Sequence, residues 1–286
     1  MSEKTLLLID SMNVAYRAFY AIRELSTRDG RPTNALFGFI KTLQQLQQTW
    51  KPTHWAAVFD GGLPGERMDA LATYKAQREP MPDALERQLG DIDEYLVRAA
   101  VTSFYMGGEE ADDVMATVAL RAARDRVNVL LATTDKDMYQ IVDDRISIVP
   151  PSSTGSRMGP EEVAAKTGVR PERIVEWLAL MGDAADNIPG VPGIGPKTAA
   201  RLLKEFGALD ALWGRLDAVS SEKLRAKLAE HRDEVVRNVG LVTLRSELDC
   251  EWDWEDLAVR EPDPAELLPF YEDMEFHSLA RALRSA

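Results

Sequence analysis

Three apolar segments of this chain each run into an aspartate, and this pattern limits the possible folds more than any other feature of the sequence. The segments are residues 5–10, 55–60 and 127–132, and a fourth strand-like segment covers residues 146–149. The aspartates that follow or end the first three are Asp10, Asp60, Asp135 and Asp137. Predicted helices separate the segments, so we expect an α/β fold with a mostly parallel central sheet flanked by helices. Ligands of such sheets bind outside the carboxyl ends of the strands. Each aspartate taken alone also allows a simpler interpretation, as a turn former or helix cap.

A cluster of acids opens a predicted helix in the middle of the chain. Glu110, Asp112 and Asp113 precede an apolar run at helical spacing that starts with Val114. In that helix Glu110 and Asp113 lie on one face, and Asp112 lies beside them. The helix macrodipole favours acids in a first turn, and for one carboxylate this explanation is sufficient. Three carboxylates in one turn repel one another, which suggests a compensating cation.

Two helices are expected between the first two strands. One begins near Asn13, and the next begins at Asn34, which we predict to be its N-cap. The segment after the second strand, residues 61–98, starts with glycines, prolines and basic residues and continues as a helix with an apolar face. Because it follows a strand that ends at the presumed site, we interpret it as a lid or arch. A solvated loop with scattered charges is the alternative.

The second half of the chain changes to a pattern of predicted helices after residue 151. We therefore divide the chain into an α/β core of residues 1–158 and a helical domain of residues 159–286. The tail after Cys250 is acidic, and we expect it to return over the first domain.

A hairpin between two helices of the second domain has the composition of a phosphate-binding device. The residues concerned are Gly190, Gly193, Gly195, Lys197 and Thr198. The glycines let backbone N–H groups approach an anion, and Lys197 and Thr198 stand at the positive N-terminus of the next helix. Such a device contacts a nucleic-acid backbone without reading bases. A further acidic pair, Asp183 and Asp186, precedes it by a few residues.

The overall charge of the chain does not favour nucleic-acid binding. The net charge is −13, whereas general DNA binders are usually basic, so the positions of the acids matter more than their sum. The sequence shows no signal peptide and no apolar run long enough to cross a bilayer. Its single cysteine excludes an internal disulfide and a cysteine-rich zinc site. We expect a monomeric, cytoplasmic protein with no membrane partner.

The carboxylates define the chemistry that the chain can support. There are nine: Asp10, Asp60, Glu110, Asp112, Asp113, Asp135, Asp137, Asp183 and Asp186. Oxygen ligands of this kind suit Mg²⁺ or Mn²⁺, and nine exceed the needs of one ion. Two ions about 3.5–4 Å apart form the clamp used for in-line displacement at phosphorus.

The sequence lacks the residue motifs of other common catalytic mechanisms. The histidines His54, His231 and His277 are far apart, and there is no Gly-x-Ser-x-Gly elbow or P-loop motif. A positioned acid or base alone accelerates a reaction by about 10²–10⁴-fold, whereas the total rate enhancement of enzymes is roughly 10⁶–10¹⁷-fold. Metal-dependent phosphodiester hydrolysis is therefore the predicted reaction.

The motifs occur together and in order, and they resemble the 5′→3′ exonuclease/flap endonuclease family, in particular the N-terminal 5′-nuclease domains of bacterial DNA polymerase I. They are Ile9-Asp10 with Ala15-Tyr16-Arg17, Val58-Phe59-Asp60, Tyr74-Lys75 with Arg78, Glu110 to Asp113, Thr134 to Asp137, and Gly182-Asp183 through Thr198. The resemblance implies a PIN-like nuclease core, a helical arch and a helix-three-turn-helix motif. It also implies a structure-specific deoxyribonuclease of DNA replication and repair, which acts on a 5′ single-stranded end or flap at a duplex junction.

The resemblance also assigns roles to individual residues. The first metal ion would be held by Asp60, Glu110, Asp112, Asp113 and Asp135, with Asp10 nearby through water. The second would be held by Asp137, Asp183 and Asp186, with Asp135 shared. Catalytic roles fall to Lys75, Arg78, Asp10 and Asp113, with Lys75 and Arg78 near the scissile phosphate. DNA contacts fall to Arg17, Tyr74, Gly190, Gly193, Gly195, Lys197 and Thr198, with a potassium ion at the hairpin and a DNA polymerase as fused or working partner.

Two positions depart from the family pattern, and two other functions stay open. Ser11 stands where glycine is usual, and Glu109 stands where an apolar residue is common, but neither change removes a ligand. A non-catalytic DNA-junction binder would keep the fold, although the complete carboxylate set argues against it. A ribonuclease with a related acidic core is the other alternative, and the hairpin suited to a duplex argues against that.

Overall fold

A five-stranded parallel sheet lies at the centre of the computed structural model, which describes residues 4–152 and 156–285. In space the strands follow the order β3-β2-β1-β4-β5, and every neighbouring pair is parallel. Their bounds are β1 Thr5–Asp10, β2 His54–Phe59, β3 Thr102–Tyr105, β4 Asn128–Ala132 and β5 Ile146–Val149. The predicted parallel sheet is confirmed, and so are the four strands that the sequence indicated. All four of these strands match their predicted segments to within a residue at each end.

Strand β3 was not predicted, and its composition explains why. It is a four-residue edge strand in which Phe104 is buried while Ser103 and Tyr105 are exposed. One buried side chain in a short segment gives no apolar run and little periodicity.

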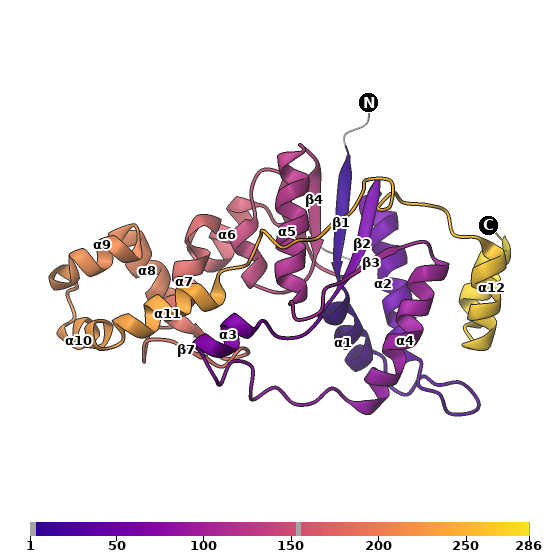
Figure 1. Ribbon diagram of the computed structural model, residues 1–286, viewed down its shortest axis with the longest axis horizontal. Helices are drawn as coiled ribbons and strands as arrows, with labels where there is room; N and C mark the ends of the chain where they lie inside the picture. Colours follow the sequence, from indigo (N-terminus) through magenta and orange to yellow (C-terminus); the bar gives the residue numbers. More distant parts are fainter. Residues whose placement is uncertain (1–3, 153–155, 286) are drawn as a thin grey trace.

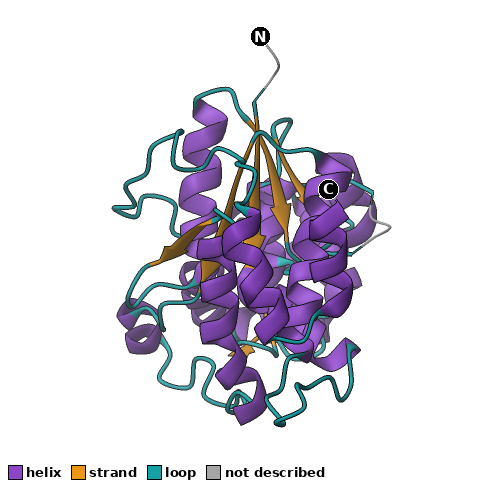
Figure 2. Ribbon diagram, turned by 90° about the vertical axis from the view of Figure 1, so that its right-hand side faces the viewer, coloured by secondary structure: helices purple, strands orange, loops and turns teal. Residues whose placement is uncertain are grey.

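Helices cover both faces of the sheet, as Figure 2 shows in purple around the orange strands. Leu7 and Ile9 of β1 face a core shared with α1 (Ser11–Ala21), α2 (Asn34–Trp50) and α4 (Asp83–Arg98). Leu6 and Leu8 face the opposite core, which contains α5 (Ala111–Arg124). Burial of each leucine stabilises the fold by about 1.5–3 kcal/mol. A slip of β1 by one residue would move every side chain to the other face, so the alternation fixes the register of β1.

Two predicted helix starts need correction. Helix α1 begins at Ser11, two residues before the start predicted near Asn13, because Asp10 is its N-cap and accepts a hydrogen bond from Asn13 N (2.9 Å). Asn34 is the first residue of α2 and not its N-cap. Its amide nitrogen instead donates to the carbonyls of Phe19 and Ile22 at the end of α1, at 2.9 and 2.8 Å. The side chain thus satisfies acceptors of the preceding helix.

The segment predicted as an arch crosses between the two halves of the molecule. It contains the short helix α3 (Gly65–Ala70), a non-helical stretch over residues 71–82, and α4. In Figure 1 it starts near α11 and runs along the lower side of the molecule to α4, on the side toward which β1 points. It therefore passes the carboxyl ends of the strands.

The second half of the described chain is mainly helical, as predicted. Between β5 and the C-terminal tail its elements are α6 Pro160–Thr167, η2 Pro171–Arg173, α7 Ile174–Met181, β6 Gly182–Asp183, β7 Ile188–Pro189, α8 Pro196–Phe206, α9 Leu209–Gly214, η3 Leu216–Ala218, α10 Glu222–Glu230 and α11 Arg232–Val242. The 3₁₀ helix η1 (Asp137–Ile141) lies between β4 and β5 in the first half. Pro196 opens α8 and Gly207, with φ +85°, ends it, which confirms the predicted signals. The predicted division at residue 158 stays a prediction.

The C-terminal tail returns to the first domain, as predicted. Leu257 O accepts a hydrogen bond from Trp55 N, and Val259 N donates to Thr53 O, so the tail runs along the start of β2. Helices α12 (Pro264–Asp273) and α13 (His277–Ser285) then pack against the α2 and α4 side of the sheet, at the right of Figure 1. No helix in residues 4–152 and 156–285 is both long and apolar enough to span a membrane.

Candidate active site

A cavity of about 1020 Å³ opens at the carboxyl ends of β1 and β2 and at the start of α5. Five of the predicted ligands line it: Asp10, Asp60, Glu110, Asp112 and Asp135. They come from four separate parts of the chain, because parallel strands place their carboxyl ends at one edge of the sheet. Of the other predicted residues, Arg17, Lys75 and Arg78 also line this cavity.

Asp10 is both a helix cap and a member of the acidic group. One carboxylate oxygen caps α1, and the other accepts a hydrogen bond from Thr133 Oγ1 (2.8 Å). Burial raises the pKa of Asp10 from its usual value near 3.8 to about 6, although both hydrogen bonds act in the opposite direction. The nearby carboxylates of Asp60 and Asp135 raise this pKa further.

The carboxyl groups of Asp112 and Asp135 both have raised pKa values and lie close to other carboxylates of the cavity. Burial raises the pKa of Asp112 well above its usual value, and repulsion from Asp135, Asp10 and Asp137 adds to the effect. Burial likewise raises the pKa of Asp135, although the hydrogen bond that its Oδ1 accepts from Asp137 N (2.8 Å) opposes this. Asp60 is more exposed and accepts a hydrogen bond from Ala111 N (2.9 Å) at the start of α5.

Glu110 and Asp113 lie on one face of the helix start, as predicted, and both contact the guanidinium of Arg67. Arg67 Nη1 pairs with Glu110, and Arg67 Nη2 donates to Asp113 Oδ1 (2.8 Å). The second oxygen of Asp113 is buried and has no hydrogen-bond partner in the described part of the chain. Arg245 N also donates to Asp113 (2.9 Å). Asp113 therefore faces the second domain and does not line the cavity that Asp112 lines.

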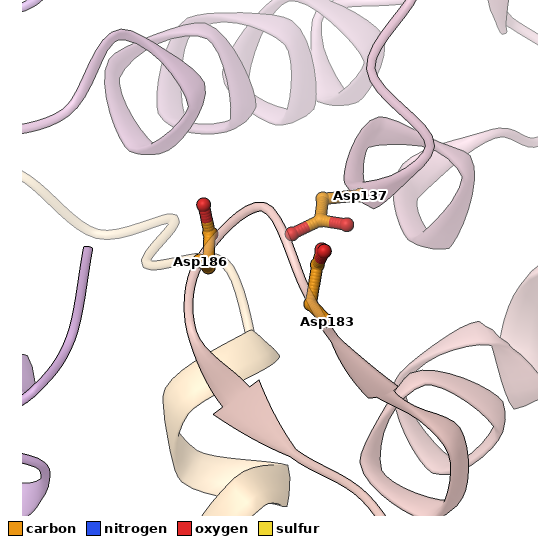
Figure 3. A group of neighbouring side chains, drawn as sticks. All are labelled: Asp137, Asp183 and Asp186. Carbon is orange, nitrogen blue, oxygen red and sulfur yellow. The ribbon is translucent and has the colours of Figure 1, made fainter. Parts of the chain in front are cut away.

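A second acidic group consists of Asp137, Asp183 and Asp186. Each of them offers a carboxylate oxygen, and these oxygens all lie within 4.8 Å of one another. Figure 3 shows Asp183 at the end of β6 and Asp186 in the turn between β6 and β7, with Asp137 reaching them from η1. Burial raises the pKa of Asp137 well above its usual value, and repulsion from Asp135 and Asp183 adds to this. Asp137 Oδ1 is buried without a hydrogen-bond partner among the described residues.

Cations of the arch segment connect the two acidic groups. Lys75 Nζ pairs with Glu110 and lies 3.6 Å from Asp186, and Arg78 Nη2 donates to Asp186 (2.8 Å). Lys75 has a φ of +53°, a left-handed conformation unusual for a lysine, and its N–H donates to Asp186 O (3.0 Å). Tyr74 is buried, and its hydroxyl lies 3.0 Å from Glu110 Oε2 and 3.4 Å from Asp186 Oδ2.

The predicted phosphate-binding hairpin forms a separate surface. Lys197 is exposed in the first turn of α8, after Gly195 as N-cap, and Gly193 has a φ of +87°. Gly190 is tightly packed, because a Cβ there would lie 2.1 Å from the carbonyl carbon of Met181. Thr198 N donates to Gly195 O (3.0 Å). The potassium ion stays a prediction, and one carbonyl of the turn, that of Pro192, accepts a hydrogen bond from Lys227 Nζ (2.6 Å).

Three basic residues of the site were not predicted: Arg67, Lys136 and Arg245. Lys136 Nζ donates to Asp183 (2.7 Å), and this hydrogen bond raises the lysine pKa even though burial acts against it. Arg245 pairs with Glu109 (2.5 Å), which accounts for an acid at that position. Their partners lie from 43 to 136 residues away along the chain, so no local pattern identifies them. Lys136 offered one signal, since it lies between Asp135 and Asp137.

The residues present fit divalent cations with oxygen ligands. The two groups are all-carboxylate, and burial together with repulsion between the carboxylates raises the pKa values of several members. Asp137 has a buried oxygen without a partner in the described structure. A hard cation held there would supply that partner and would reverse the local charge.

Comparison with solved structures identifies the fold. The chain matches the bacteriophage T5 D15 protein co-crystallised with metal ions with a TM-score of 0.70 and 24% identity, covering 95% of this chain and 98% of that one. It matches the catalytic core of Rad2 in complex with DNA substrate with a TM-score of 0.67 and 18% identity, covering 95% and 88%. Together with the convergent carboxylates, these matches define a PIN-like α/β core joined to a helical domain.

Sequence comparison identifies the family. A model of the 5′-3′ exonuclease N-terminal resolvase-like domain matches residues 5–168, and a model of the 5′-3′ exonuclease C-terminal SAM fold matches residues 169–265. The chain belongs to the 5′-3′ exonuclease family, which confirms the predicted resemblance.

Two relatives differ in how much of their length the chain covers. It is 35% identical to the 5′-3′ exonuclease of Aquifex aeolicus over 278 residues, which is 97% of this chain and 94% of that protein. It is 40% identical to the thermostable DNA polymerase I of Thermus thermophilus over 274 residues, 96% of this chain. The chain spans about a third of the length of the DNA polymerase I relatives.

Proposed function

We propose that this chain is a structure-specific 5′→3′ exonuclease and 5′-flap endonuclease that hydrolyses DNA phosphodiesters with two Mg²⁺ or Mn²⁺ ions. The observation that carries the proposal is the convergence of carboxylates from the α/β core and from the helical hairpin on one region of the molecule. The family, the relative named as a 5′-3′ exonuclease and the D15 flap endonuclease solved with DNA and metal ions support the same assignment.

Each acidic group would hold one ion. We assign Asp60, Glu110, Asp112 and Asp135 to the first, with Asp10 nearby through water. Asp137, Asp183 and Asp186 are assigned to the second, with Asp135 shared. Asp113 remains in the proposal for the first ion, although its side chain pairs with Arg67 and faces the second domain. Two ions held at these positions would supply an activated water molecule and would stabilise the charge that develops on the phosphate oxygens.

The chain's own residues bind and position the substrate. Lys75 and Arg78 are held at the edge of both acidic groups, where they can donate to the scissile phosphate once it enters. The sequence predicts that Tyr74 contacts DNA. In the structure its hydroxyl donates to Glu110 and so orients that carboxylate. Arg17 is exposed on α1 and faces the cavity, so it suits a DNA phosphate.

The hairpin supplies a second contact, with the duplex backbone. Gly193, Gly195, Lys197 and Thr198 place backbone N–H groups, an ammonium and a helix N-terminus on one surface. Gly190 shapes the turn from within. A potassium ion at the turn carbonyls belongs to the same proposal.

The wider setting is also proposed. DNA with a 5′ single-stranded end or flap at a duplex junction is the substrate, in replication and repair, and a DNA polymerase is the fused or working partner, as in the DNA polymerase I relatives. The chain acts as a monomer in the cytoplasm, since both acidic groups come from one chain and a single cysteine suits a reducing compartment.

A cleavage assay on a labelled 5′-flap duplex tests the proposal. We expect cutting with Mg²⁺ or Mn²⁺, loss of cutting in excess chelator, and products with 5′-phosphate and 3′-hydroxyl ends. A matched RNA flap tests the ribonuclease alternative. Undiminished cutting in chelator, or tight junction binding without any cutting, would exclude the two-metal nuclease.

A further inference from the structure

One wall of the active-site cavity is apolar and exposed, and the metal chemistry gives it no role. Residues 4–152 and 156–285 expose six large hydrophobic side chains, and three of them line this cavity. They are Tyr20, Leu63 and Tyr105, with 66%, 38% and 69% of their surfaces exposed. An exposed apolar residue standing alone is ordinary, but a group of them in one cavity indicates a binding surface.

Tyr20 is held rigidly at the far end of this wall. It lies on the same face of α1 as Asn13 and Arg17, which also line the cavity. Ten residues separate it from Asp10, so it lies about 15 Å along the helix axis from the first carboxylate. Its ring stacks on Tyr16 (6.5 Å between centroids, 20° between planes) and meets Phe19 edge-on at 5.2 Å. These contacts fix the ring while leaving most of it exposed.

Tyr105 reaches the cavity from β3, an edge strand of the sheet. On β3 the side chains alternate, so Ser103 and Tyr105 line the cavity while Phe104 enters the core. Strand β3 is the edge strand next to β2, whose end carries Asp60. Leu63, in the loop that follows β2, also lines the cavity. The wall is thus assembled from a helix, a loop and a strand.

The charges in the cavity identify the kind of ligand that suits this wall. The exposed guanidinium groups of Arg17 and Arg78 line the same cavity, so it combines aromatic faces with cations. Single-stranded nucleic acid is recognised by this combination, because bases stack on the aromatic rings while cations follow the phosphates.

We propose that Tyr20, Leu63 and Tyr105 form a stacking wall for unpaired nucleobases of the DNA strand that is cut. The inference depends on the proposed nuclease function and names a further part of its substrate site. The distance along α1 places the base on Tyr20 several nucleotides from the scissile phosphate. The wall therefore distinguishes a substrate with an unpaired strand from a plain duplex, whose bases are already stacked.

Paired substrates with and without bases test this directly. The flap carries either normal nucleotides or abasic residues at successive positions, and binding is measured in Ca²⁺ with the Tyr105→Ala and Tyr20→Ala variants. Loss of one stacking contact lowers affinity by about tenfold for the normal flap. On the flap with abasic residues at the matching position, each variant and the wild type should bind equally. Tyr105→Phe and Tyr20→Phe, which keep the ring, should bind as the wild type does.

Val97→Ala is the matched control, because Val97 is 72% exposed on α4 and does not line the cavity. A 2-aminopurine base placed in the flap provides a second measurement, since its fluorescence falls when it stacks on a ring. The inference is wrong if the alanine variants lose equal affinity for normal and abasic flaps, or if neither variant changes affinity or fluorescence. Those results leave wild-type flap cleavage intact, whereas absence of wild-type cleavage would overturn the proposed function instead.

Discussion

Arg67→Met removes a buried cation that touches two carboxylates at once. Arg67 is 7% exposed, and it contacts Glu110, Asp113 and the carbonyl of Thr243 at the end of α11 (3.1 Å). Methionine keeps much of the apolar stem, so the change removes mainly the charge and its hydrogen bonds. Removing one partner of a buried ion pair costs about 3–5 kcal/mol, since the remaining charge stays buried without compensation.

The expected loss of stability is therefore large for a single substitution. At about 2–4 °C for each kcal/mol, the melting temperature should fall by about 6–20 °C. The assay is denaturant and thermal unfolding in excess chelator, so that bound ions do not contribute. Cleavage should fall as well, because Glu110 loses a contact that orients it.

A surface ion pair gives the matched control. Arg124 and Glu247 lie 2.9 Å apart with side chains 66% and 75% exposed, so Arg124→Met should cost no more than about 1 kcal/mol. Arg67→Met combined with Asp113→Asn should lose less than the sum of the two single changes, since they share one interaction. If Arg67→Met lowers the free energy of unfolding by as little as Arg124→Met does, the reasoning about the buried ion pair is wrong.

Two further substitutions test the hairpin. Lys197→Glu should weaken DNA binding similarly across sequences and lower the slope of log affinity against log salt by about one, because one phosphate contact is lost; an unchanged slope would show that the hairpin does not touch the backbone. Gly190→Ala should destabilise the fold by about 1–3 kcal/mol, because its Cβ would lie 2.1 Å from Met181 C. Gly240→Ala in α11, where a Cβ meets nothing within 4 Å, should be neutral or stabilising in the same unfolding assay.

Much of the fold was predictable because its signals are local. Buried strands and the Pro196 and Gly207 boundaries of α8 depend on neighbouring residues, and the structure confirms them. The edge strand β3 escaped prediction because only Phe104 of its four residues is buried. Asn34 is a residue type that often caps helices, but its side chain donates to carbonyls at the end of the preceding helix. This partner depends on how the two helices pack, which the local sequence does not show.

The candidate site shows the same division between local and distant information. The helix period correctly placed Glu110 and Asp113 on one face. It gave no indication that this face would meet Arg67, which precedes Glu110 by 43 residues, while Asp112 would turn toward the other aspartates. The acids were visible as motifs, whereas their basic partners became identifiable only once the chain was folded.

Asp135→Asn tests the central claim most directly, because Asp135 lies between the two acidic groups and the change keeps the side chain's size. The measurement is single-turnover cleavage of a 5′-flap duplex at saturating enzyme, beside an equilibrium binding titration, with Asp144→Asn as the control at an exposed aspartate. We expect near-wild-type binding, since the hairpin and arch supply most contacts, and a cleavage rate lower by orders of magnitude, since the ions act mainly on the transition state. Cleavage by Asp135→Asn at close to the wild-type rate would show that Asp135 only forms the turn, and would contradict the metal assignment.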